Sequence, residues 1–227
     1  MSNGMSAFSN KHERMYSDPS DIIISDRRYN LIIGGVIVYG VLLNAVIVKL
    51  LGPVFINMNP FALFIGYLVL CIAGCVIAYR SDDPLVSFGG YNLVVLPVGA
   101  VLSVCLQGYD TGVIFQAFLM TTIVTAVMLV AASAFPGTFA GMGRMLFIAL
   151  IGLVIAQLLC MLFNIYPTVI SWVAAAIFSL YIGYDWVKAQ MYVKTVDNAV
   201  DSALDIYLDI INLFLQLLRI LGSKNND

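Results

Sequence analysis

The chain has 227 residues, of which 61% are hydrophobic and only 11% are charged. Soluble domains carry roughly 25% charged residues and 45–50% apolar ones, and the mean hydropathy of +0.96 excludes a water-soluble enzyme or a disordered regulator. The formal net charge of −2 shows no basic excess, so nothing supports binding to nucleic acid. At about 20 apolar residues per membrane-spanning helix, this length accommodates roughly seven spans. The composition therefore predicts one all-α polytopic membrane protein.

The chain begins with a polar segment that carries charges of both signs. Residues 1–28 contain no long apolar run, so we expect them to form a flexible N-terminal tail. The first such run starts only after Arg27 and Arg28, without the early apolar region and cleavage site of a secretory signal. It is therefore predicted to be an uncleaved span. Residues 29–222 then form the transmembrane domain, and residues 223–227 form a polar C-terminal tail.

Apolar segments of membrane-spanning length recur through the rest of the chain. Breaker residues such as Gly52-Pro53 and Gly89-Gly90 separate them. Pro97, within the third segment, predicts a kink whose freed carbonyl is satisfied by neighbours. We expect seven transmembrane helices, at Tyr29–Leu50, Phe61–Arg80, Tyr91–Gln107, Gly112–Ala134, Met142–Asn164, Thr168–Lys188 and Ala203–Leu221.

The basic residues near the span ends predict the orientation of the chain. More of these basic residues lie on the membrane side that holds the N-terminus than on the opposite side. Arg27, Arg28 and Arg80 are among the first group, and Lys49 is in the second. Because cytoplasmic loops carry the excess of Lys and Arg, we expect a cytoplasmic N-terminus. Seven full spans would place the C-terminus outside. A last helix that only re-enters the membrane would keep it inside, and the charge rule fits both versions.

The cysteines give no indication of a cofactor. Cys71 and Cys75 share one helix face, but no His or further Cys stands near them to complete a zinc set. Cys105 and Cys160 also lie in apolar runs, so all four are interpreted as small buried hydrophobic residues. We therefore predict neither a disulfide framework nor a bound cofactor.

Ionisable residues inside the spans are the informative ones, because each costs several kcal/mol at mid-bilayer unless it is paired or hydrated. Asp185 lies near the end of the sixth span, and Asp209 lies in the last one with apolar sequence on both sides. At about 100° per residue, the strongly polar residues of the last helix fall within about 80° of arc. They are Asp201, Asp205, Asp209, Asn212, Gln216 and Arg219. Such a stripe cannot face lipid, so we expect the last helix to be central.

Asp185 and Asp209 are predicted to approach each other, because a short connection makes their helices antiparallel neighbours. Two close carboxylates in a low dielectric cannot both ionise cheaply, so a shared proton is a natural pH switch. The doubly ionised pair is a natural oxygen site for Ca²⁺. Arg80, at the inner end of the second span, could pair with either acid or snorkel to the interface. The supporting polar residues of the stripe are Asp205, Asn212 and Gln216.

Each acid also has a plainer interpretation. Asp201 and Asp205 can be solvated or interfacial residues in the first turns of a helix, where acids favour the positive end of the helix dipole. Asp197 is interpreted as a loop residue. Asp185 could be interfacial and paired with Lys188 at i+3.

The final segment carries a recognisable signature. The run Ala203–Gly222 (ALDIYLDIINLFLQLLRILG) resembles the C-terminal signature of the Bax inhibitor-1 family, the transmembrane Bax-inhibitor-motif proteins. Gly141–Gly152 (GMGRMLFIALIG), which opens the fifth span, and Tyr184-Asp185, which closes the sixth, are similar to further motifs of that family. With the span count included, the resemblance covers about residues 29–222, and we expect a prokaryotic member.

The resemblance implies six transmembrane helices around a central seventh. It also implies a pH-sensitive calcium leak, with roles in stress protection and, in eukaryotes, in suppression of cell death. The paired aspartates of the family map onto Asp185 and Asp209, and its gating arginine maps onto Arg80. Two departures would shift the pH set point. Asp205 stands where relatives have a small or uncharged residue, and the loop at residues 133–138 lacks their basic residues.

Three functions are compared on these grounds. The favoured one is a pH-gated Ca²⁺ leak channel in the bilayer, with Asp185 and Asp209 held closed by protonation or by Arg80. A non-conducting stress regulator acting through protein partners would use the aspartates to pack helices. An intramembrane aspartyl protease is disfavoured, because Tyr207-Leu208-Asp209 lacks the Gly-x-Gly-Asp motif of that class, so we expect no enzyme. The compact chain favours a prokaryotic plasma membrane.

Overall fold

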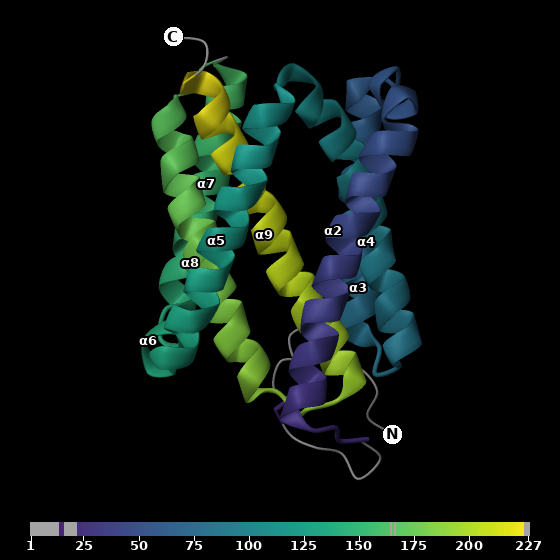
Figure 1. Ribbon diagram of the computed structural model, residues 1–227, viewed down its shortest axis with the longest axis vertical. Helices are drawn as coiled ribbons and strands as arrows, with labels where there is room; N and C mark the ends of the chain where they lie inside the picture. Colours follow the sequence, from purple (N-terminus) through teal and green to yellow (C-terminus); the bar gives the residue numbers. More distant parts are fainter. Residues whose placement is uncertain (1–13, 16–21, 164, 166, 225–227) are drawn as a thin grey trace, which may run out of the picture. The chain divides into compact units, whose positions relative to one another are not determined.

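The computed structural model describes residues 14–15, 22–163, 165 and 167–224, and all regular structure in these residues is helical (Figure 1). Most of the predicted N-terminal tail lies outside the described residues. So do the end of the predicted C-terminal tail and Asn164, the predicted end of the fifth span. The described helices are α2 (Asp26–Ile56), α3 (Pro60–Arg80), α4 (Pro84–Cys105), the short 3₁₀ helix η1 (Leu106–Gly108), α5 (Thr111–Ala134), α6 (Pro136–Ala140), α7 (Gly143–Leu162), α8 (Thr168–Met191) and α9 (Val196–Lys224).

Local sequence explains where α3 and α4 begin. Both start at a proline, whose missing N–H costs nothing in the first turn of a helix. The side chain of the preceding residue caps each helix. Asn59 accepts hydrogen bonds from the backbone N–H groups of Phe61 and Ala62, and Asp83 accepts one from Leu85 at 2.8 Å.

Six of the described helices are long and apolar enough to cross a membrane: α2, α3, α4 with η1, α5, α7 and α8. They correspond to the first six predicted spans, so the prediction of an all-α membrane protein is confirmed at this level. Helix α9 is not among the six. It has 29 residues but carries Asp197, Asp201, Asp205 and Asp209 within its first half. That it forms a seventh, central span stays a prediction.

Two predicted breaks are wrong. Helix α2 continues through Gly52-Pro53 to Ile56, and α4 begins at Pro84 and runs through Gly89-Gly90. Glycine serves helix packing here rather than a turn, because a Cβ on Gly74 of α3 would lie 2.6 Å from the carbonyl oxygen of Gly90. The two backbones therefore approach more closely than any side chain would allow.

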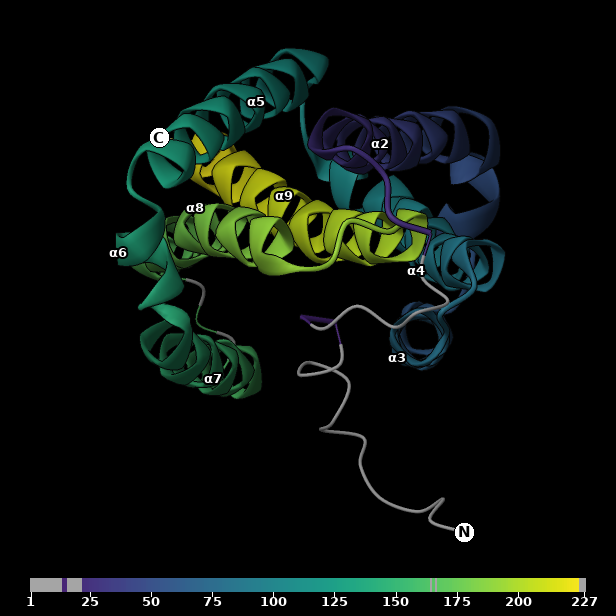
Figure 2. The ribbon, with the colours of Figure 1, turned by 90° about the horizontal axis from the view of Figure 1, so that it is seen from below.

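The chain divides into two compact units. The first comprises Met1–Gly108 with Met191–Leu204, and the second comprises Tyr109–Gln190 with Asp205–Asp227. Within the first unit, α4 packs against both α2 and α3, which is visible in Figure 2. Tyr91 of α4 is fully buried there, and its hydroxyl donates a hydrogen bond to the carbonyl of Val36 at 2.8 Å.

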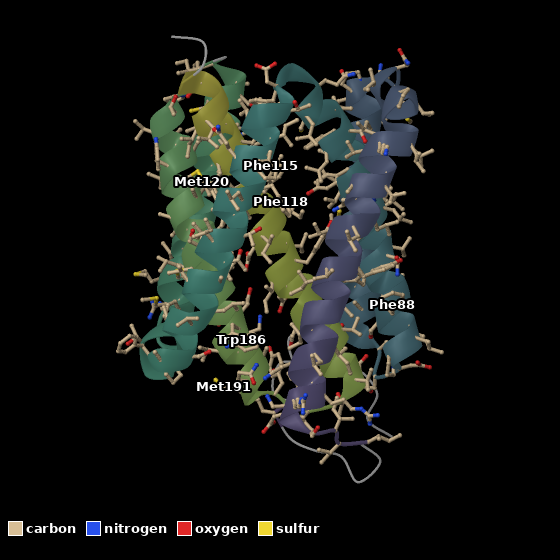
Figure 3. The ribbon with its side chains drawn as sticks, viewed as in Figure 1. Phe88, Phe115, Phe118, Met120, Trp186 and Met191 are labelled. Atoms are coloured by element: carbon tan, nitrogen blue, oxygen red, sulfur yellow. The ribbon has the colours of Figure 1, made fainter. Side chains whose placement is uncertain are left out.

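The second unit contains α5 to α8 and the larger part of α9. Ala132, Phe139 and Val187 form a buried apolar cluster that joins α5, α6 and α8. Beside it, the indole N–H of Trp186, labelled in Figure 3, donates to the Ser133 hydroxyl at 3.0 Å. Large apolar side chains also remain exposed on α5, among them Phe115 and Phe118 (Figure 3). The buried charged residues of this unit lie where α8 and α9 meet.

Candidate functional site: an acidic cluster between two helices

Tight packing fixes the end of α8 that carries Asp185. A Cβ built on Gly183 would overlap the ring of Phe139, and one built on Gly143 would lie 2.6 Å from the hydroxyl oxygen of Tyr184. Glycines at both positions therefore let α8 approach α6 and the start of α7 closely. As a result, the turn of α8 that directly precedes Asp185 is packed closely against α6 and α7.

Lys188 joins α8 to α9. Its ammonium nitrogen lies 2.8 Å from a carboxylate oxygen of Asp185 and 2.7 Å from one of Asp205. The three side chains are largely buried, with exposed fractions of 18% for Lys188, 9% for Asp185 and 18% for Asp205. The ammonium also lies 5.8 Å from the centre of the Tyr184 ring. One cation is thus held between two carboxylates from different helices.

Asp209 lies one turn beyond Asp205 and completes the cluster. Its side chain is buried, and its carboxyl group lies close to that of Asp185. The Oδ2 atom of Asp209 has no hydrogen-bond partner among the described residues. Tyr181, one turn before Asp185, lies within electrostatic reach of both Asp185 and Asp209. The structure therefore places Asp185 and Asp209 in one cluster, with Lys188 and Asp205 as its other members.

The polar stripe continues along α9 past the cluster. Asn212 donates a hydrogen bond to the carbonyl of Leu208 in its own helix at 2.8 Å. Gln216 is 5% exposed, and its Oε1 atom has no hydrogen-bond partner among the described residues. Arg219, at the far end of the stripe, is exposed. The second unit thus contains two buried, unsatisfied oxygens on one face of α9, those of Asp209 and Gln216.

Arg80 lies in the other unit. It is the last residue of α3, its side chain is exposed, and it has no ion pair among the described residues of its own unit. Its predicted pairing with Asp185 or Asp209 stays a prediction. The cation that contacts the acids within the second unit is Lys188.

The first turns of α9 contain polar contacts that the sequence does not reveal. Asp197 is a buried helical residue rather than a loop residue, and it accepts a hydrogen bond from the hydroxyl of Ser87 at 2.5 Å. Asp201 is completely buried, which differs from the predicted interfacial position, and it forms an ion pair with Arg14. Arg14 also lies 5.2 Å from the centre of the Tyr79 ring. No local signal predicts these contacts, because the sequence around Asp197 is polar and nothing in the polar tail marks Arg14.

Burial affects the ionisation of two groups near the start of α9. Desolvation raises the pKa of Asp197, although the hydrogen bond from Ser87 and the charge of Arg14 oppose this change. Desolvation also lowers the pKa of Lys194, in the connection before α9, against the opposing charge of Asp26. The Lys194 ammonium lies 4.4 Å from the centre of the Tyr29 ring. Both groups are therefore held in surroundings that disfavour their charged forms.

Metal binding requires more ligands than the described residues supply in one place. No group of three or more His, Cys, Asp or Glu side chains that could hold a metal ion occurs in the part of the chain that the structure describes. The predicted Ca²⁺ ligands Asp185 and Asp209 are two oxygen donors, and the position next to Asp185 is taken by the ammonium of Lys188. A resident metal centre is therefore not supported by this geometry.

Together, six apolar helices and a buried acidic cluster define a multi-pass helical membrane protein. The sequence profile of the family described as "Inhibitor of apoptosis-promoting Bax1" matches residues 24–226. The chain belongs to this family, which confirms the predicted relationship to Bax inhibitor-1 proteins.

Bacterial relatives agree with this assignment. An uncharacterized protein of Helicobacter pylori (strain ATCC 700392 / 26695) is 39% identical over 139 residues, which are 60% of this chain and 57% of that protein. An uncharacterized membrane protein of Streptococcus pyogenes serotype M3 is 33% identical over 135 residues, 56% of this chain and 59% of the relative. The inner membrane protein YbhL of Escherichia coli is 35% identical over 121 residues, 46% of this chain and 51% of the relative. The chain thus spans about half the length of the curated relatives it matches.

Proposed function

We propose that this protein is a pH-sensitive calcium leak channel whose gate is the contact between Asp185 and Asp209. The observation that carries the proposal is the close approach of these two buried carboxyl groups, which come from different helices. A hydrogen bond between two carboxyl groups requires one proton, whereas two ionised carboxylates repel each other in a low dielectric. Loss of the proton therefore weakens the contact between α8 and α9.

The side chains around Asp185 and Asp209 are suited to link the loss of this proton to the entry of a cation. Lys188 and Asp205 lie in the same cluster, and Tyr181 and Tyr184 line it from α8. Buried polar groups without partners are costly in an apolar environment. The unsatisfied oxygens of Asp209 and Gln216 would be hydrated, or would bind a passing cation, when the contact opens. Ca²⁺ prefers such oxygen ligands and enters this proposal as the transported ion.

The proposal is tested by measuring Ca²⁺ flux into liposomes that contain the purified protein, over a range of pH. We expect flux that depends on pH in the wild type, and a changed pH profile in Asp185→Asn and Asp209→Asn, because an amide cannot exchange the proton. Asp110→Asn, an exposed aspartate before α5, is the matched control. Wild-type flux with the same pH profile in both site variants would contradict the mechanism. Absence of flux, with a stable co-purifying protein, would favour a non-conducting regulator instead.

A further inference from the structure

The position of Lys188 between Asp185 and Asp205 has the geometry of a bound cation. Its ammonium nitrogen contacts one oxygen of each carboxylate, at 2.8 Å and 2.7 Å, and all three side chains are largely buried. Charge-assisted contacts of this length are the strong ones in proteins. Asp209 adds a buried carboxylate oxygen without a partner in the same cluster. Among the described side chains, the cluster therefore brings three carboxyl groups to the ammonium of Lys188.

A lysine side chain can move away from such a position more easily than an arginine side chain can. The ammonium is a compact charge on a flexible four-carbon stem, whereas an arginine would be held by its planar fork. Ca²⁺ takes about six to eight oxygen ligands from carboxylates, carbonyls and waters. The carboxylates of Asp185 and Asp205 would supply some of these and water the rest, so the binding would be weak and transient. Lys188 and a passing cation would compete for the same two oxygens.

We propose that Lys188 is a tethered counter-cation, which occupies the position of a permeating cation between Asp185 and Asp205 and sets the concentration at which external cations enter. The role of Lys188 in permeation rests on the proposed channel function. The competition between Lys188 and divalent cations for the carboxylates does not depend on that channel function. Lys188 thus sets the affinity of the cluster for external cations, beside the proposed gate at the Asp185–Asp209 contact.

The test uses Lys188→Met, which keeps the length of the side chain but removes its charge, and Lys188→Arg, which keeps the charge. Lys49→Met, at an exposed position of α2, makes the same change of net charge away from the cluster. Two quantities are measured for each purified protein. One is the thermal midpoint in detergent with and without millimolar Ca²⁺, and the other is the Ca²⁺ concentration that gives half-maximal flux in liposomes at constant pH.

We expect Ca²⁺ to raise the thermal midpoint of Lys188→Met by about 2 °C or more, since a ligand that binds only the folded state stabilises it. Wild type, Lys188→Arg and Lys49→Met should shift much less. The half-maximal Ca²⁺ concentration should fall several-fold in Lys188→Met alone. Adding Asp205→Asn to Lys188→Met should abolish both effects, because one of the two carboxylates is gone. Where Lys188→Met does not fold, Lys188→Gln carries the same test, since its amide keeps one hydrogen bond to a carboxylate.

The outcomes separate this inference from the channel proposal. A Ca²⁺-dependent midpoint in Lys188→Met without any flux in the wild type would support the competition and overturn the channel. Wild-type flux that depends on pH, with Lys188→Met identical to wild type in midpoint and half-maximal concentration, would overturn the role of Lys188 and leave the channel standing. A midpoint shift equal in Lys49→Met and Lys188→Met would also overturn it, because the effect would then be one of net charge.

Discussion

The ammonium group of Lys188 and a carboxylate oxygen of Asp205 lie 2.7 Å apart and connect α8 to α9 within the second unit. Because Lys188 contacts Asp185 as well, its loss removes this cation from the buried Asp185 and the partly buried Asp205, beside the buried Asp209. Removing one partner of a buried ion pair costs more than the pair itself contributes.

We therefore expect Lys188→Met to lower the free energy of unfolding by about 2–4 kcal/mol. Asp205→Asn should lower it by only about 1 kcal/mol, because Lys188 keeps its contact with Asp185. The double variant should lose less than the sum of the single losses, as expected for residues in contact. Chemical unfolding in detergent micelles measures all three values. Strict additivity of the two losses would show that the contact contributes little.

A second prediction concerns Gly183, where α8 packs against α6. A methyl group at this position would overlap the ring of Phe139, which is 6% exposed and cannot move aside freely. Gly183→Ala should therefore lower the free energy of unfolding by about 1–3 kcal/mol, the usual cost of overpacking. Gly152→Ala on α7 is the matched control, since nothing lies within 4 Å of its added Cβ. That variant should be neutral or slightly stabilised.

The same measurement decides whether the Phe139 ring is the cause. Shortening it with Phe139→Leu in the Gly183→Ala background should recover part of the loss. If Gly183→Ala and Gly152→Ala have the same stability, the close approach of α6 to α8 does not constrain the position of Asp185.

A third prediction concerns the contact between α3 and α4 in the first unit. A Cβ on Gly74 would lie 2.6 Å from the carbonyl oxygen of Gly90, which is backbone and cannot rotate away. Gly74→Ala should force the two helices apart and cost about 3 kcal/mol, at the upper end of the range for overpacking. Gly66→Ala, on the same helix and with open space around it, is the control. Equal unfolding midpoints for the two variants would contradict this account.

Most of the helices could be predicted from sequence, because apolar length is a local property. The limits of α3 and α5 agree with their predicted spans to within one residue. Gly89-Gly90 was misassigned as a break, since a glycine that permits close helix packing has the same appearance in sequence as one that permits a turn. The difference depends on Gly74, which lies on another helix.

The acidic residues of the site could be predicted from sequence for a similar reason, whereas their ion-pair partners could not. Asp185 and Asp209 stand out because charge is rare in apolar sequence. Lys188 could be recognised as an i+3 partner of Asp185, but its second contact, with Asp205, depends on how α8 and α9 pack. Arg14, which lies 187 residues from Asp201, belongs to a tail without any periodic pattern. Long-range ion pairs of this kind have no local signal.

The last prediction follows from Asp197, in the first turn of α9 and before the apolar part of that helix. Burial raises the pKa of Asp197, the charges of Asp82 and Asp83 raise it further, and the Ser87 hydrogen bond and Arg14 oppose them. The folded protein therefore holds this proton more tightly than the unfolded chain, whose aspartates titrate near pH 3.9. The contribution of Asp197 to stability is thus full below about pH 3.9 and is lost as the pH rises through the folded-state pKa.

Asp197→Asn removes this titration and keeps an oxygen that can accept the Ser87 hydrogen bond. We expect the thermal midpoint of the variant to fall less than that of the wild type as the pH rises from about 4 toward neutrality. Asp110→Asn, an exposed aspartate in the second unit, should keep the wild-type slope. Thermal unfolding in detergent at a series of pH values measures these slopes. Parallel curves for wild type and Asp197→Asn would mean that Asp197 ionises equally easily in the folded and unfolded chain, and that the Ser87 and Arg14 contacts fully offset its burial.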